Sequence, residues 1–227
     1  GALTRIEVVA LCARQLRSKL PLFIELLRKS FTALSTEDLS LLRTSNRKLR
    51  PELARLQNLK LNASSALDRV PDEDLESGHL YLLVLDYLHE MGHEVENAIK
   101  SDLQHVDNSH KPLMKEQIDE LLELLDLVES HFNTTLQAYE ELDPDQVDHL
   151  EGQLKTYIRQ TRETRKKHIK RIQSRTVGTR NSLLFINHLG ELRNLTLFNN
   201  RIVKVLNDLI LDKIADSEEE PNTSRTN

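Results

Sequence analysis

The sequence predicts an all-α protein of six long helices. Leucine is abundant and charged residues make up 30% of the 227 positions, whereas Gly and Pro number only 6 each. This composition favours long helices and leaves little turn chemistry for a sheet. Apolar residues also recur every three to five positions, near the period of a helix. Polar or proline-containing breaks divide that pattern into six segments.

The first half of the chain accounts for three of these helices, at 3–34, 35–70 and 72–106. Pro21 is expected to kink or split the first helix, and Pro51 to kink the second. The second helix follows the segment Ser35-Thr36-Glu37-Asp38, which provides an N-cap hydroxyl and acids for the first turn. The third follows a turn at 70–74, where Pro71 precedes a capped start.

The second half predicts three more helices, at 114–142, 143–175 and 181–215. A polar connector at 105–112 precedes them, because Pro112 ends a helix that arrives from upstream. In the fifth helix, Asp143 is the expected cap and Pro144 the first helical position. Residues 176–179 separate the last two helices, and the polar residues 216–227 predict a disordered tail.

The six helices divide into two sets of three, at 1–107 and 112–215, followed by the tail at 216–227. Helices of this length are typical of up-and-down bundles. A weak internal repeat supports the division: residues 86–93 (DYLHEMGH) align without gaps with 187–194 (NHLGELRN). Both segments lie in the third helix of their half. The sequence therefore predicts two three-helix up-and-down bundles.

Composition narrows the classes of function. The single cysteine, Cys12, excludes an intramolecular disulfide and indicates a reducing compartment. No apolar run reaches the roughly 18 residues of a membrane span. The net charge of −5 does not favour general nucleic-acid binding.

A histidine pair on the third helix is the first candidate site. Residues 89–93 read HEMGH, which spells the zinc-protease motif HExxH. On a helix, His89 and His93 lie one turn apart with Asp86 beside them, so the three could hold one divalent transition metal, Zn or Fe. Leu82 and Leu85 lie on the same side, which predicts that the second bundle or a partner packs there.

The protease interpretation requires more than this spelling. It needs Glu90 as a general base, a third metal ligand downstream and a substrate cleft. No downstream residue stands in a recognisable third-ligand motif, and no strand is predicted beside which a substrate could lie. A metal site without catalysis and a plain polar helix face are the alternatives.

The fifth helix carries the second candidate site. Residues 159–175 contain eight Lys or Arg against one acid, Glu163. An anionic partner, either a membrane lipid surface or an acidic protein segment, would meet this charge. The alternative is a solvated face that balances the acidic third and fourth helices. Nucleic acid is not favoured, since only Tyr157 interleaves with the charges. The candidate contacts are Arg159, Arg162, Lys166 and Lys170.

The connector between the halves offers a further polar cluster. His105, Asp107 and His110 could ligate a metal, but Asp and Asn in a connector more often serve turn chemistry. Cys12 lies within an apolar stripe and is expected in the core.

These segments resemble a known family. Two three-helix halves, each with a related segment in its third helix, are similar to the PhoU-like fold, and residues 87–99 resemble the PhoU signature. More specifically, VLDYLHEMGH at 84–93 followed by HVDNSHKPL at 105–113 resembles the soluble C-terminal extension of bacterial PiT-family inorganic phosphate transporters. The resemblance covers most of residues 14–212, and its most specific part is the HVDN-x-HKP segment.

The resemblance implies a cytoplasmic regulatory domain of a membrane phosphate transporter, with no enzymatic activity. Its expected partners are the transmembrane part of the same transporter or a phosphate-signalling protein, and its expected location is the cytoplasmic face of the cell membrane. A metal-dependent hydrolase and a free-standing helical adaptor stay open as alternatives.

The resemblance also has an implication for metal binding by this chain. In PhoU proteins, pairs of acidic motifs bind iron or zinc clusters on the bundle surface. The matching positions here are His89 and His93 in the first half and Gly190 and Asn194 in the second. The acidic pair is absent from both halves, so the expectation reduces to a single divalent ion beside the histidines.

Overall fold

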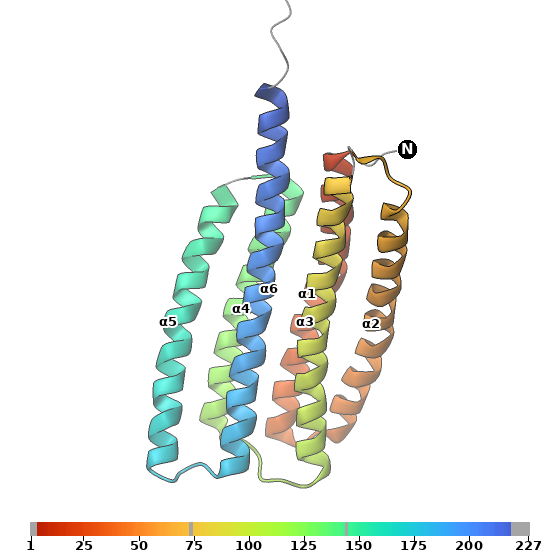
Figure 1. Cartoon of the computed structure of the whole chain (residues 1–227). Coiled ribbons are helices and arrows are strands. Elements are labelled where there is room, and N and C mark those ends of the chain that lie inside the picture. The colour runs from red at the N-terminus through yellow and green to blue at the C-terminus, as the bar shows by residue number, and fades with distance from the viewer. Residues whose placement is uncertain (1–3, 73–74, 144, 219–227) are drawn as a thin grey trace, which may run out of the picture.

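Six helices form an up-and-down bundle in the computed structural model, which describes residues 4–72, 75–143 and 145–218 (Figure 1). Over these residues the chain contains no strand, so the predicted all-α class is confirmed. In the same part of the chain, no helix is long and apolar enough to cross a membrane. The helices are α1 (Arg5–Thr36), α2 (Leu39–Leu67), α3 (Leu75–Asp107), α4 (Lys115–Glu141), α5 (Asp145–Gln173) and α6 (Thr179–Glu218).

The two prolines inside helices do not end them. α1 continues through Pro21 and α2 through Pro51, so the split expected at Pro21 does not occur. Both prolines lie on exposed faces. Each proline lacks the N–H that would bind the carbonyl four residues earlier. On an exposed face water can hydrate that carbonyl, so the helix can continue past the proline.

Side-chain caps fix several helix ends. Thr4 and Glu7 form a reciprocal capping box at the start of α1. Asp38, rather than Ser35 or Thr36, caps α2, because α1 continues to Thr36. The Asp143 carboxylate accepts the backbone N–H of Asp145, as expected for the cap of α5.

Some expectations fall outside the described residues. They are the capped start at residues 73–74, the first helical position at Pro144, and residues 219–227 of the predicted tail. The remaining tail residues, 216–218, are helical, since α6 continues to Glu218.

Four helices form the centre of the molecule. α1 and α3 pack together, α4 and α6 pack together, and α1–α4 and α3–α6 contacts join the two pairs. α2 lies outside against α1 and α3, and α5 lies outside against α4 and α6 (Figure 1). One hydrophobic cluster includes side chains from all six helices. The two sets of three helices therefore share one core.

α2 packs tightly against α3 at Gly92. A Cβ atom added there would lie 2.2 Å from Leu53 Cδ2 and 3.4 Å from Phe23 Cζ. Leu53 of α2 therefore occupies the space that any larger residue at position 92 would need. Gly92 and the fully buried Met91 lie in the middle of the HEMGH segment. Packing alone therefore explains the residue types at these two positions of the motif.

Candidate functional site

The structure brings the predicted histidine pair together. The rings of His89 and His93 lie 4.5 Å apart, centroid to centroid, on the outer part of α3. Asp86, the third predicted ligand, lies one turn before His89 and binds a lysine of α2. Lys60 Nζ is 2.8 Å from Asp86 Oδ1 and 3.3 Å from His89 Nδ1. It is therefore α2 of the same half, and not the second bundle, that reaches α3 at Asp86 and His89. The packing of a partner beside Leu82 and Leu85 stays a prediction.

Lys60 opposes metal binding at this site. Its ammonium group holds the position between Asp86 and His89 where a shared cation would bind, and two cations repel. Burial, followed by the charges of Lys60 and His93, lowers the pKa of His89. Within the described residues, no three His, Cys, Asp or Glu side chains come together in a way that could hold a metal ion. The metal site at His89, His93 and Asp86 stays a prediction that requires Lys60 to move.

The internal repeat does not place equivalent residues in equivalent surroundings. Glu90 is exposed, whereas Glu191, which aligns with it, is largely buried against His188. His89 aligns with Gly190, where an added Cβ would meet no atom within 4 Å. An exposed Glu90 with no third ligand nearby gives no support to the hydrolase interpretation.

A buried polar network joins three central helices. Asp102 of α3 accepts a hydrogen bond from Ser30 Oγ of α1 at 2.6 Å. Its second oxygen accepts from His188 Nε2 of α6 at 2.5 Å, and His188 Nδ1 donates to Glu191 Oε2 at 2.8 Å. Ser30, Asp102 and His188 are completely inaccessible to solvent. The network therefore links the two halves of the chain at the centre of the bundle.

Opposing effects set the charge of His188. Burial favours the neutral ring, but the adjacent Asp102 and Glu191 carboxylates outweigh it and raise the pKa of His188 to about 10. The imidazole therefore carries its proton at neutral pH. Because it joins α1, α3 and α6 in the interior, the network can hold these helices in register.

Sequence reasoning missed this network. Asp102 lies four residues after Ala98 and seven after Val95, both buried, so it is on the core stripe of α3. A carboxylate at that spacing signals a buried partner. The identity of the partner, 86 residues away, cannot be read from the stripe.

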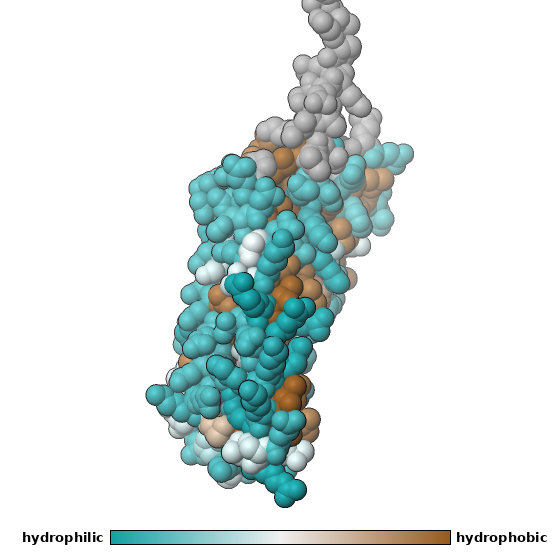
Figure 2. Space-filling view, turned by 90° about the vertical axis from the view of Figure 1, so that its left-hand side faces the viewer, coloured by the Kyte–Doolittle hydropathy of each residue, from teal (hydrophilic) through white to brown (hydrophobic). Residues whose placement is uncertain are grey.

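The predicted basic site is solvent-accessible. Arg159, Arg162, Lys166 and Lys170 are all exposed. Their spacing places them in one stripe of α5, opposite the buried Tyr157, Thr164 and His168. We refer to these four residues as the α5 basic stripe. Figure 2 views the molecule from the α5 side and shows a mostly hydrophilic surface with separate hydrophobic patches.

Not every cation of this segment is exposed. Arg171 is buried, contacts the carboxylate of Glu120 on α4, and lies over the ring of Phe185 on α6. Arg171 therefore fixes α5 to the rest of the bundle, and a partner could reach only the remaining charges. Beside the basic stripe, a groove of about 290 Å³ separates α5 from α6, and Arg162, Arg165 and Arg193 line it together with Leu154, Ile158 and Leu197.

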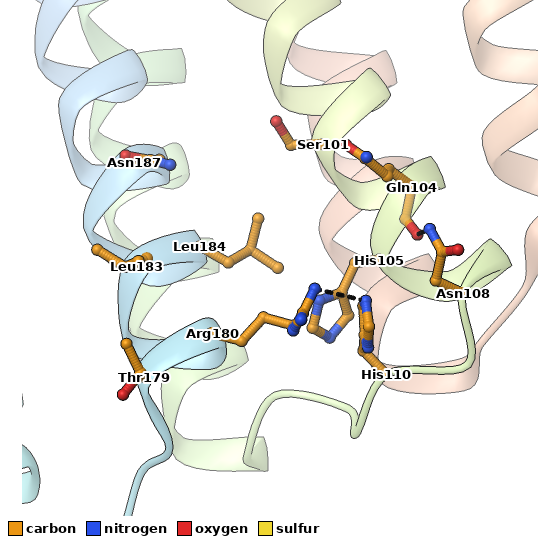
Figure 3. Close-up of a pocket in the computed structure, with 10 residues that line it drawn as sticks. All are labelled: Ser101, Gln104, His105, Asn108, His110, Thr179, Arg180, Leu183, Leu184 and Asn187. Carbon is orange, nitrogen blue, oxygen red and sulfur yellow. Dashed lines mark hydrogen bonds between the residues drawn. The ribbon is translucent and has the colours of Figure 1, made fainter.

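The connector after α3 contacts the start of α6. His105 Nε2 donates to the Lys111 carbonyl at 2.8 Å, and Asn181 Nδ2 donates to the same carbonyl at 3.0 Å. Arg180 donates to His110 Nε2 at 2.7 Å (Figure 3). Asp107 is directed to α2 instead, where its Oδ1 lies 3.6 Å from Arg43 Nη2. The structure thus brings His105 and His110 together but places Asp107 elsewhere, so these three do not form a metal site.

Comparisons with known proteins identify the fold. No family model matches the chain, and a search of curated proteins gives no match. Among solved structures, the chain is similar to the crystal structure of the phosphate transport system regulatory protein PhoU from Streptococcus pneumoniae. The TM-score is 0.71 at 17% sequence identity, over 88% of this chain and 94% of the other. The predicted PhoU-like architecture is confirmed.

Proposed function

We propose that this chain is a regulatory module of phosphate transport with no catalytic role of its own. The similarity to PhoU, a phosphate transport system regulatory protein, is the observation that carries the proposal, because it extends over nearly the whole length of both chains. Fold alone does not fix function. The residues of the chain supply the rest of the argument.

We further propose that the module acts at the cytoplasmic face of the membrane, through the transmembrane part of a PiT-family phosphate transporter or a phosphate-signalling protein. The resemblance of residues 84–93 and 105–113 to the extension of such transporters supports this link. The α5 basic stripe supplies the contact surface. Its four cations are exposed, and the only acid that pairs with any of them is the exposed Glu163, at 3.5 Å from Lys166, among the described residues. Such a stripe attracts an acidic protein segment or anionic lipid headgroups.

Phosphate uptake in cells tests the proposal. Deleting the gene should change how the rate of phosphate uptake responds to external phosphate, and the full-length wild-type gene should restore that response. A variant with the α5 basic stripe reversed to glutamate should accumulate normally but fail to restore it. The matched control reverses four exposed cations on other helices: Arg14, Arg47, Arg50 and Lys204. Unchanged uptake after deletion would refute the regulatory role, and equal restoration by both variants would refute the contact surface.

The full-length gene product separates the transporter-linked module from a free-standing adaptor. Apolar spans of about 20 residues in the same polypeptide are expected for the transporter-linked form. A full-length product without such spans would favour the adaptor.

A further inference from the structure

A polar pocket lies where the α3–α4 connector meets the first turn of α6. It has a volume of about 780 Å³, within the range of small-molecule sites. Arg180 and His110 converge on one side of it with His105 behind them, and Leu183 and Leu184 form part of another wall (Figure 3). Ser101, Gln104, Asn108, Thr179 and Asn187 complete the lining.

The lining supplies donors and positive charge but no carboxylate. Three amides, two hydroxyls, two imidazoles and one guanidinium line the pocket. The nearby acid at the end of α3, Asp107, is directed to Arg43 on α2. The start of α6 adds the partial positive charge of a helix N-terminus. A pocket with this lining favours an anion over a cation or a neutral ligand.

The Arg180 guanidinium is available to bind such an anion. Among the described residues, no carboxylate lies within salt-bridge distance of it. Its hydrogen-bond partner is His110, whose Nε2 is an uncharged acceptor. Burial, followed by the charges of Arg180 and His105, lowers the pKa of His110, which keeps that ring neutral. A guanidinium presents five donors in a planar fork that matches the oxygens of a phosphate group.

Other contacts hold the connector to α6 besides the bond from Arg180 to His110. His105 and Asn181 both bind the Lys111 carbonyl, and Asn181 also binds the carbonyl of Pro112. These bonds fix the connector without the guanidinium of Arg180. A role for Arg180 in ligand binding is therefore compatible with a stable loop.

We propose that this pocket binds a phosphate group, either as inorganic phosphate or as the monoester of a small molecule. Arg180 would bind two of its oxygens, with His110 and the nearby amides as further donors. The pocket is much larger than a single phosphate ion. Leu183, which is 55% exposed, offers an apolar surface for the organic part of a monoester. The inference goes beyond the regulatory proposal and does not depend on it.

Isothermal titration calorimetry on the purified chain tests the proposal, with inorganic phosphate and adenosine monophosphate as separate probes at constant ionic strength. Saturable binding of at least one probe is expected. Arg180→Ala should weaken it about tenfold or more, because it removes charge-assisted hydrogen bonds. Arg14→Ala, an exposed arginine on α1, should leave it unchanged.

The two probes distinguish the sources of the phosphate group. Binding of both with similar affinity indicates inorganic phosphate, and tighter binding of the monophosphate indicates an organic ester. Absence of saturable binding by either, or equal loss in Arg180→Ala and Arg14→Ala, overturns the proposal. Circular dichroism melting checks that the variants fold. His110→Ala, which removes the imidazole donor and keeps Arg180, is the second variant should Arg180→Ala melt early, and it too should weaken binding.

Discussion

Asp102 is a buried carboxylate whose burial can be predicted from the local sequence, but whose partners cannot. Its position on the apolar stripe of α3 indicates burial, and a buried carboxylate requires a donor. The structure supplies two donors, Ser30 and His188, from different helices. Removing one member of such a pair leaves the other charge buried without compensation.

Asp102→Asn is expected to lower the free energy of unfolding by about 3–5 kcal/mol, the usual cost of breaking a buried ion pair from one side. Urea denaturation at pH 7 measures this cost. The exposed Asp119→Asn serves as the control and should change stability by less than about 0.5 kcal/mol. A loss of similar size in both variants would contradict the role of the network.

The raised pKa of His188 also predicts a pH dependence. The folded pKa is about 10 and the ordinary value is 6.5, so the stabilisation is fully present below pH 6.5 and is lost as the pH rises through 10. Unfolding free energy should therefore fall between pH 7 and 9 by about 1.4 kcal/mol per pH unit. The Cys12 thiol, whose pKa burial raises from 9.0 to about 12, adds to this fall only in the upper part of the window, so the slope between pH 7 and 8 is the one that reports on His188. In Asp102→Asn the unfolding free energy should fall less steeply with pH. An unchanged slope would mean that a group other than His188 causes the pH dependence.

Lys60 provides a third prediction at the scale of the residue. Its charge lowers the pKa of His89, so Lys60→Met should raise that pKa. Loss of the lysine also leaves the Asp86 carboxylate free to favour the imidazolium ion. An NMR titration of the His89 ring protons measures the change. Lys48→Met, which removes a lysine paired with Glu25, is the control and should not shift His89.

At the scale of the helix, two glycines of α3 and α6 differ sharply. An added Cβ at Gly190 meets no atom within 4 Å, whereas at Gly92 it collides with Leu53. Gly190→Ala should raise the free energy of unfolding by about 0.5–1 kcal/mol, the difference in helix propensity. Gly92→Ala should raise the free energy of unfolding by less than this amount, or should lower it, because the buried Leu53 must change its packing. Urea denaturation of both variants gives the comparison, and equal stabilisation would show that Leu53 adapts freely.

The sequence predicted the helices better than their contacts. All six helices follow from apolar periodicity, and the Asp143 cap follows from side-chain chemistry near the break. The α1 end was misplaced because Ser35 and Thr36 are good caps in isolation, yet the helix continues and Asp38 takes that role. The partners of Asp102 and Lys60 lie on other helices, and that of Arg180 lies in the α3–α4 connector, so a single sequence gives no signal for them.

At the scale of the whole molecule, the shared core predicts mutual dependence of the halves. Contacts of α1 with α4 and of α3 with α6 bury apolar side chains that either half alone would expose. Fragments 1–111 and 112–227 should each lack cooperative thermal unfolding, and mixing them should restore it. Circular dichroism melting of the fragments, singly and mixed, measures this. A cooperative transition in either isolated fragment would instead support two separable three-helix domains.

The start of α1 and the end of α6 lie at the opposite end of the bundle from the pocket at the α3–α4 connector. α1 begins and α6 ends at one end, while the α3–α4 and α5–α6 connectors lie at the other (Figure 1). α6 has 40 residues, so at 1.5 Å per residue it is about 60 Å long. Immobilising the protein through either end, on a sensor chip or a glass surface, would therefore hold the pocket away from the support. Ligand exchange can be followed on the tethered molecule without altering a residue of the pocket.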